Sequence, residues 1–188
     1  LHASGVANAA MFGPELEFFV FDSAWYDQSI NAAGYRVDSA EGVWNRGRQD
    51  PANLGYQVRQ RDGYFPTPPM DTLHNLRSEM VALLRDLGVT VEGHHHEVAT
   101  GGQCEIDLRH GPLLRLADAC MLAKYVVKGV AARHGKVATF MPKPLFGDNG
   151  SGMHTHFSLW KDGANLFGGN RYAGLSQLGL FAIGGILK

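Results

Sequence analysis

Apolar and polar residues alternate along several short stretches of the chain, and this alternation predicts β-strands. The first stretch, MFGPELEFFVFD (11–22), is rich in Phe and Val and follows the alternation closely. Successive side chains of a strand point to opposite faces. Leu16 and Phe18 therefore share one face, and Glu15 and Glu17 share the other. The first face suits a core, while the second carries two carboxylates.

A second stretch, 90–109, predicts a β-hairpin. Its strands cover 90–98 and 103–109, and its turn contains Thr-Gly-Gly. A hairpin centred on Gly101 places Glu97 directly opposite Glu105. Cross-strand Cβ atoms are about 4.5–5.5 Å apart, and like charges at that separation are destabilising. We therefore expect a cation to offset this repulsion.

Each predicted strand has one apolar and one polar face. The polar faces carry His95 with Glu97, then Gln103, Glu105 and Asp107, and finally His154, His156 and Ser158 in the strand 153–160. One such strand is ordinary for a sheet with one solvated face. Together, however, these faces contain four glutamates and no lysine. Oxygen ligands with one or two imidazoles suit Mg²⁺ or Mn²⁺ better than Zn²⁺, so the pattern predicts a site for these cations.

The remaining pattern predicts helices and one long irregular segment. Helices are expected over 70–88, with Asp71 as N-cap, over 112–135, and from about Leu175 onward, and a further strand over 136–141. Residues 23–69 lack periodicity, and loops of that length are usually functional. Strands joined by hairpins and interrupted by helices indicate an α+β fold with a mainly antiparallel, curved sheet and flanking helices.

Several polar residues are predicted to have structural roles. Alternation places His94 and His96 on the face opposite Glu97, which favours a structural or exposed position for both. Cys104 faces the core, and Lys143 is expected to be a solvated loop charge. The run Asn-Gly-Ser-Gly at 149–152 would let the backbone approach a ligand closely.

Charge and composition exclude several classes of partner. The net charge is −1, from 17 basic and 18 acidic residues. Such a balance provides no general attraction to nucleic acid or to an anionic membrane surface. No apolar run is long enough to span a bilayer. The two cysteines form neither a metal motif nor a disulfide framework, and no signal peptide is evident, so we expect a cytoplasmic location.

Four segments together resemble class I, bacterial-type glutamine synthetases. They are GPELEFFVFD, GYQVRQRDGYFPTPPMD, HHHEVATGGQCEI and KPLFGDNGSGMHTHFSLWKDG, and they follow the family's order from about residue 12 onward. The resemblance implies that residues 1–188 are part of the catalytic domain. It also implies that the family's N-terminal small domain and the C-terminal part of its catalytic domain are absent. The family assembles into homo-oligomers, as dodecamers.

The resemblance also implies roles for particular residues. One metal would be held by Glu17, Glu97 and Glu105, and a second, beside the ATP phosphates, by Glu15 and His154. ATP would contact Glu92, His156 and Ser158. Asn149 and Gly150 would bind the substrate L-glutamate. The implied cofactors are two or more Mg²⁺ or Mn²⁺ ions, with ATP as co-substrate.

The implied reaction has two steps. ATP phosphorylates the γ-carboxylate of glutamate, and ammonia then displaces phosphate to give glutamine. One alternative is a γ-glutamyl-amine ligase of the same superfamily, which differs in the nucleophile; a guanidine phosphotransferase is a more distant one. A non-catalytic fragment that binds metal and nucleotide is an alternative from a different class.

Overall fold

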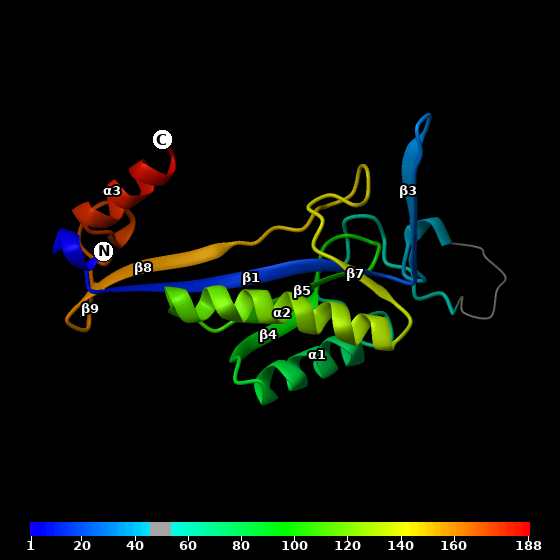
Figure 1. The fold of residues 1–188 in the computed structure, drawn as a ribbon, viewed down its shortest axis with the longest axis horizontal. Coiled ribbons are helices and arrows are strands. Elements are labelled where there is room, and N and C mark those ends of the chain that lie inside the picture. Colours follow the sequence, from blue (N-terminus) through cyan, green and yellow to red (C-terminus); the bar gives the residue numbers. More distant parts are fainter. Residues whose placement is uncertain (46–53) are drawn as a thin grey trace.

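The computed structural model describes residues 1–45 and 54–188. It contains one large antiparallel sheet, one separate hairpin, two long helices on one face of the sheet, and a third helix near the chain's C-terminus at the far end of the sheet (Figure 1). The strands are β1 (Ala9–Phe21), β2 (Ser23–Gln28), β3 (Ala33–Asp38), β4 (Val91–His96), β5 (Gln103–Leu108), β6 (Gly111–Pro112), β7 (Val137–Thr139), β8 (Thr155–Lys161) and β9 (Ala164–Asn165). The α-helices are α1 (His74–Asp86), α2 (Leu113–Arg133) and α3 (Gln177–Ile186), and the 3-10 turns are His2–Ser4, Val43–Asn45 and Tyr172–Gly174.

The long strand β1 organises the sheet, because four strands pair with it. Along one edge of β1, from its N-terminal end, β6 pairs first and β5 second. Along the other edge, β8 pairs first and β7 second. Between β7 and β8 the chain leaves this second edge and returns where the Glu15 amide donates to the His154 carbonyl, at 2.9 Å. Residues 140–154 form this excursion, which lies beside the middle of β1.

Helices α1 and α2 cover one face of the sheet (Figure 1). Their apolar residues pack on the side chains that alternation assigned to the core, including Leu16, Phe18 and Cys104. This confirms the predicted α+β class with a mainly antiparallel sheet and flanking helices. It also leaves the opposite face of β1, β4 and β5 free for the carboxylates.

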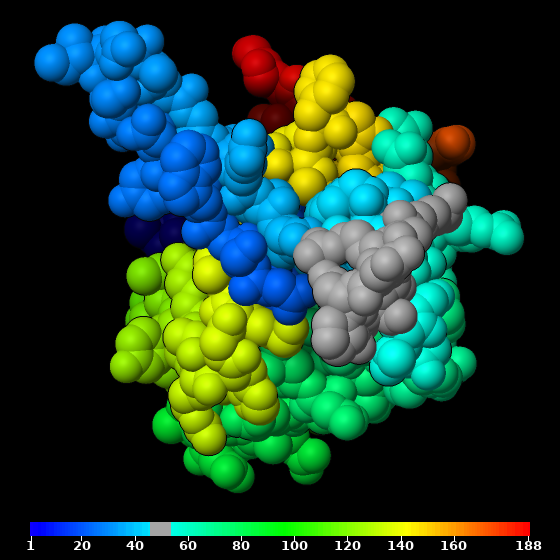
Figure 2. All heavy atoms as spheres, turned by 90° about the vertical axis from the view of Figure 1, so that its right-hand side faces the viewer, coloured from blue at the N-terminus to red at the C-terminus, as the bar shows by residue number. Residues whose placement is uncertain are grey.

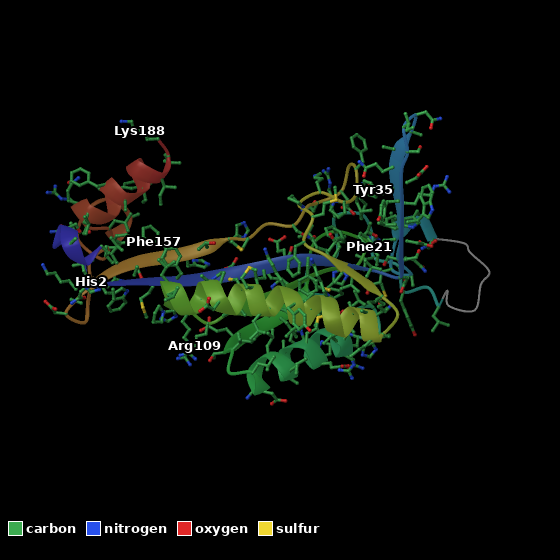
Figure 3. The ribbon with its side chains drawn as sticks, in the orientation of Figure 1. His2, Phe21, Tyr35, Arg109, Phe157 and Lys188 are labelled. Carbon is green, nitrogen blue, oxygen red and sulfur yellow. The ribbon has the colours of Figure 1, made fainter. Side chains whose placement is uncertain are left out.

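The separate hairpin of β2 and β3 was not predicted. It pairs Ser23 with Asp38 through Gln28 with Ala33, and it projects from the end of β1 away from the rest of the molecule (Figure 2). Every residue of β2 is exposed. Neither face is buried, so the sequence lacks the apolar alternation that reveals a half-buried strand. The Tyr35 hydroxyl, seen in Figure 3, donates to the Pro144 carbonyl at 2.7 Å and ties β3 to the 140–154 excursion.

The start of α1 differs from the prediction. The helix begins at His74 with Leu73 as its N-cap, so the predicted cap at Asp71 is wrong. Asp71 is instead buried, and its carboxylate binds the guanidinium of Arg77, which is fully buried. The predicted helices over 112–135 and from about residue 175 are confirmed within a few residues. Among the described residues, no helix is long and apolar enough to cross a bilayer.

Candidate functional site

The hairpin of β4 and β5 has a different register from the predicted one. His95 pairs with Glu105, and the Glu97 amide donates to the Gln103 carbonyl at 2.8 Å. The predicted direct opposition of Glu97 and Glu105 is therefore wrong. In the actual register Glu97 lies opposite Gln103, two positions away from the predicted partner Glu105. Because side chains alternate with a period of two, a shift of two keeps every residue on its predicted face.

Three carboxylates still converge on that face. Glu105 pairs with His95 on one side and with Glu17 of β1 on the other. One ligand atom from each of His95, Glu97 and Glu105 lies within 4.8 Å of the others. Glu17, Glu97 and Glu105 are 8%, 8% and 6% exposed. The structure thus brings the first predicted metal set together and adds His95, to which the sequence assigned a face but no role.

Two carboxyls of this cluster, Glu105 and Glu17, have raised pKa values. Burial raises the pKa of Glu105, and the neighbouring Glu97 and Asp107 carboxyls raise it further. Burial also raises the pKa of Glu17, with the charge of Glu97 as a smaller cause in the same direction. His95 Nε2 lies 3.4 Å from Glu105 Oε2, and His95 Nδ1 lies 3.5 Å from Glu97 Oε1. In the described part of the chain, histidines alone form ion pairs with the three carboxylates.

The second predicted metal pair lies beside the first cluster. His154 Nδ1 is 3.2 Å from Glu15 Oε2 and 3.9 Å from Glu17 Oε1. His156 Nε2 is 2.5 Å from the other oxygen of Glu15. The hydrogen bond with His156 is the main cause that lowers the pKa of Glu15. Glu15 therefore lies between two exposed imidazoles that favour its charged form, and it adjoins a buried cluster in which the pKa values of Glu17 and Glu105 are raised.

The three predicted ATP residues line one cavity together with Glu15. The cavity has a volume of about 470 Å³, within the usual range for small-molecule sites. Its lining includes Glu92, His156 and Ser158, and also Phe157 of β8 (Figure 3), whose ring packs against Phe12 with centroids 5.5 Å apart. The cavity thus offers both an apolar wall and polar groups next to the second metal pair.

The predicted glutamate residues, Asn149 and Gly150, lie on the 140–154 excursion. A Cβ atom at Gly150 would lie 2.3 Å from the Pro142 carbonyl oxygen, so no larger residue fits there without movement. The Gly150 carbonyl accepts a hydrogen bond from the buried Gln103 side chain at 2.9 Å. Lys143 is exposed as predicted, but its amine is not simply solvated: it donates to the Asp148 carbonyl at 2.6 Å.

Sequence reasoning missed the buried polar network behind the site. The Glu41 carboxylate accepts hydrogen bonds from Thr72 and lies 2.8 Å from His96 Nε2. His94 approaches the Arg77 guanidinium, with 3.3 Å between His94 Nδ1 and Arg77 Nε. The predicted structural roles of His94 and His96 are thereby confirmed. Glu41 gave no sequence signal, because it lies in the segment that lacks periodicity.

Fold and site together define a class: an antiparallel-sheet protein with a carboxylate-rich face that could hold a cation, next to a cavity of the size of a small-molecule site. The family model for "Glutamine synthetase, catalytic domain" matches residues 1–188. The chain belongs to this family. Glutamine synthetases from Aquifex aeolicus, Nostoc sp. and Escherichia coli are 57%, 54% and 49% identical to it across the whole chain.

The chain spans about 40% of the length of these relatives. Solved structures agree with the assignment. Plasmodium falciparum glutamine synthetase superimposes with a TM-score of 0.85 at 32% identity, over 98% of this chain and 37% of that one. A structure named apo GmaS superimposes with a TM-score of 0.72 at 30% identity, over 99% and 38%.

Replacing Glu105 with Gln is expected to have effects of opposite sign without and with metal. In metal-free protein, Glu105→Gln should raise the free energy of unfolding by about 0.2–1 kcal/mol, because on folding the Glu105 carboxyl must either take up a proton or hold a charge beside other carboxyls, and an amide does neither. In excess Mn²⁺ the wild type should be the more stable, because the cation binds the folded wild type more tightly than the variant. Thermal melts in both conditions test this. Equal destabilisation in both would show that the carboxylates do not form a cation site.

The same cluster predicts a pH dependence of the metal-free protein. A carboxyl whose pKa is raised on folding binds more protons in the folded state than in the unfolded state. The stability that Glu105 contributes should therefore fall as the pH rises above the unfolded value of about 4.3. Denaturant titrations near pH ~5 and pH ~8 should show a larger decrease for the wild type than for Glu105→Gln. Parallel curves for the two proteins would contradict the prediction.

Proposed function

We propose that this chain carries the metal- and ATP-binding part of a glutamate–ammonia ligase, which forms L-glutamine from L-glutamate, ammonia and ATP. The observation that carries the proposal is the convergence of Glu17, Glu97 and Glu105 on one face, beside the pair of Glu15 and His154. Family membership and identities of 49–57% to glutamine synthetases support the substrate assignment. They favour it over ligation of other amines.

The residues fit the divalent cations that the family implies. Three glutamates are buried, and two of them have raised pKa values that a bound cation would lower. The donors are carboxylate oxygens with one or two imidazoles, which suits Mg²⁺ or Mn²⁺. We assign one ion to Glu17, Glu97 and Glu105, and a second to Glu15 and His154. No cysteine sulfur takes part, because Cys104 is buried on the opposite face.

The reaction sets different tasks for the residues around these ions. Bound cations would screen phosphate charge and stabilise the developing charge during phosphoryl transfer. Ser158, His156 and Glu92 line the cavity in which we place ATP. Asn149 and Gly150 would hold glutamate, whose γ-carboxylate oxygen attacks the γ-phosphorus and releases ADP.

In the second step ammonia attacks the γ-carbonyl carbon, phosphate leaves with the bridging oxygen, and the attacking nitrogen loses a proton. Acyl phosphates hydrolyse readily, so the site must exclude water. We further propose a cytoplasmic homo-oligomer, which the family implies.

Activity is tested in a chimera. Residues 1–188 replace the matching stretch of the Nostoc glutamine synthetase, to which the chain is 54% identical over its whole length. We expect γ-glutamyl hydroxamate from glutamate, ATP and hydroxylamine, with the parent enzyme as control. A chimera that assembles like the parent but forms no product would refute the proposed ligase activity.

Metal choice is tested on the chain itself, by calorimetric titration after its cysteine thiols have been blocked. Mn²⁺ and Mg²⁺ should still bind, and loss of binding would refute the site.

A further inference from the structure

Gln103 connects the metal cluster to the backbone that we assign to glutamate. Its side chain is 1% exposed and lies on the polar face between β1 and the 140–154 excursion. The Nε2 group donates to Glu17 Oε2 at 3.0 Å and to the Gly150 carbonyl at 2.9 Å. One amide proton is thus donated to the carboxylate cluster and the other to the backbone of the proposed glutamate site.

The chemistry of its neighbours fixes the orientation of this amide. The Ala99 backbone N–H donates to Gln103 Oε1 at 2.9 Å. A flipped amide would place its NH₂ group against that N–H, and its oxygen against the carboxylate of Glu17 and the carbonyl of Gly150. One contact would then pair two donors and the other two would pair two acceptors, so no hydrogen bond would form. The Gln103 amide can therefore link Glu17 to Gly150 in one orientation only.

We propose that Gln103 is a positioning residue that couples metal coordination by the Glu17 carboxylate to the conformation of residues 148–150; Gly152, whose backbone N–H reaches Glu17 directly, does not depend on this link. A cation that restrains the Glu17 carboxylate would restrain the Gln103 amide, and through it the Gly150 carbonyl. Metal binding would then order the glutamate-binding backbone. Coupling is reciprocal, so glutamate would in turn tighten the metal. This inference rests on the proposed metal and glutamate sites.

The excursion has a second support that serves as a control. The side chain of Gln60 donates to the Gly147 carbonyl at 3.1 Å, and the Arg61 guanidinium donates to the same oxygen. Gln60 is an exposed glutamine that holds the 140–154 excursion at Gly147, and its hydrogen bond does not reach Glu17. Substitutions at Gln60 therefore test support of the segment without the link to the metal cluster.

Hydrogen exchange of the 149–152 amides, followed by NMR with and without saturating Mg²⁺, tests the proposal. In the wild type, Mg²⁺ should slow exchange about tenfold, the worth of one charge-assisted hydrogen bond. In Gln103→Glu, which keeps the acceptor for Ala99 but loses both donors, the slowing at Asn149 and Gly150 should disappear. In Gln60→Glu, exchange should be faster overall, but the slowing by Mg²⁺ should remain.

Metal affinity, measured on each protein by calorimetry, separates the two ways of failing. If Mg²⁺ binds Gln103→Glu and still slows exchange as in the wild type, the coupling is refuted and the metal site stands. If the wild type does not bind Mg²⁺, the proposed metal site is refuted and the coupling with it. Gln103→Met, equal in length and unable to donate, is the second variant and has the same expected result. In the chimera, Gln103→Glu should raise the KM for glutamate about tenfold and change the KM for ATP less.

Discussion

Asp71→Asn is expected to lower the free energy of unfolding by about 3–5 kcal/mol, the usual cost of removing one partner from a buried ion pair. Asp71 is 4% exposed and Arg77 is 0% exposed. The carboxylate accepts from both terminal nitrogens of the guanidinium. The variant would leave the Arg77 cation in the core beside Cys104 and His94, neither of which carries a compensating negative charge.

Urea unfolding of both proteins at one pH measures this effect. Arg133→Gln is the matched control, because Arg133 is 71% exposed and its guanidinium lies 3.4 Å from Glu79. Such surface pairs contribute about 0–1 kcal/mol. The double variant Asp71→Leu with Arg77→Met should lose less than the sum of the two single changes, because it leaves no unpaired charge. If Asp71→Asn costs no more than Arg133→Gln, the buried pair does not stabilise the fold.

The alternation of apolar and polar residues predicted the faces of the sheet but not the register of its strands. Glu17, Glu97 and Glu105 share a face as expected, since a period of two survives a shift of two positions. The register depends on the turn after β4, which is fixed by distant contacts. The Thr100 hydroxyl donates to the Val58 carbonyl at 2.5 Å, and its amide donates to Asp148 at 3.0 Å. Local sequence contains no information about these partners.

Alternation also does not distinguish a polar residue in water from one that is buried on the polar face. Gln103 and Glu105 appear as ordinary outward positions, yet they are 1% and 6% exposed. Gln103 lies against Gly150 of the 140–154 excursion, and Glu105 lies against His95, on whose ring Phe65 stacks; only the tertiary structure shows these neighbours. The hairpin of β2 and β3 escaped prediction for the converse reason, since it buries neither face. The roles proposed for these residues come from the family resemblance, whereas the alternation predicted only that they share a face.

Glu17→Gln in the chimera is expected to reduce ligase activity by at least about 100-fold, because even residues that only orient metal ligands cost about 10–100-fold when changed. Glu17 is the residue where the two predicted metal sets meet. It pairs with Glu105 across the sheet, lies 3.9 Å from His154, and accepts from Gln103. The amide of Gln is nearly isosteric but neutral, so the fold should be kept while the charge for the cation is lost.

Three measurements on this variant separate a metal ligand from a structural residue. Its thermal stability without metal should equal or exceed that of the wild type, because the pKa of Glu17 is raised and its charge is unfavourable in the empty cluster. Its affinity for Mg²⁺ should fall together with its activity, and excess Mg²⁺ should restore part of the rate. Glu79→Gln, which changes a glutamate bound to His134 at 2.7 Å on the helical side, should retain full activity. A Glu17→Gln enzyme that is stable and within about twofold of the wild-type rate, far from the 100-fold expected of a ligand, would mean that Glu17 holds no catalytic cation. A loss of activity with unchanged Mg²⁺ affinity would instead assign Glu17 to substrate positioning, through Gln103, which donates both to Glu17 and to the Gly150 carbonyl.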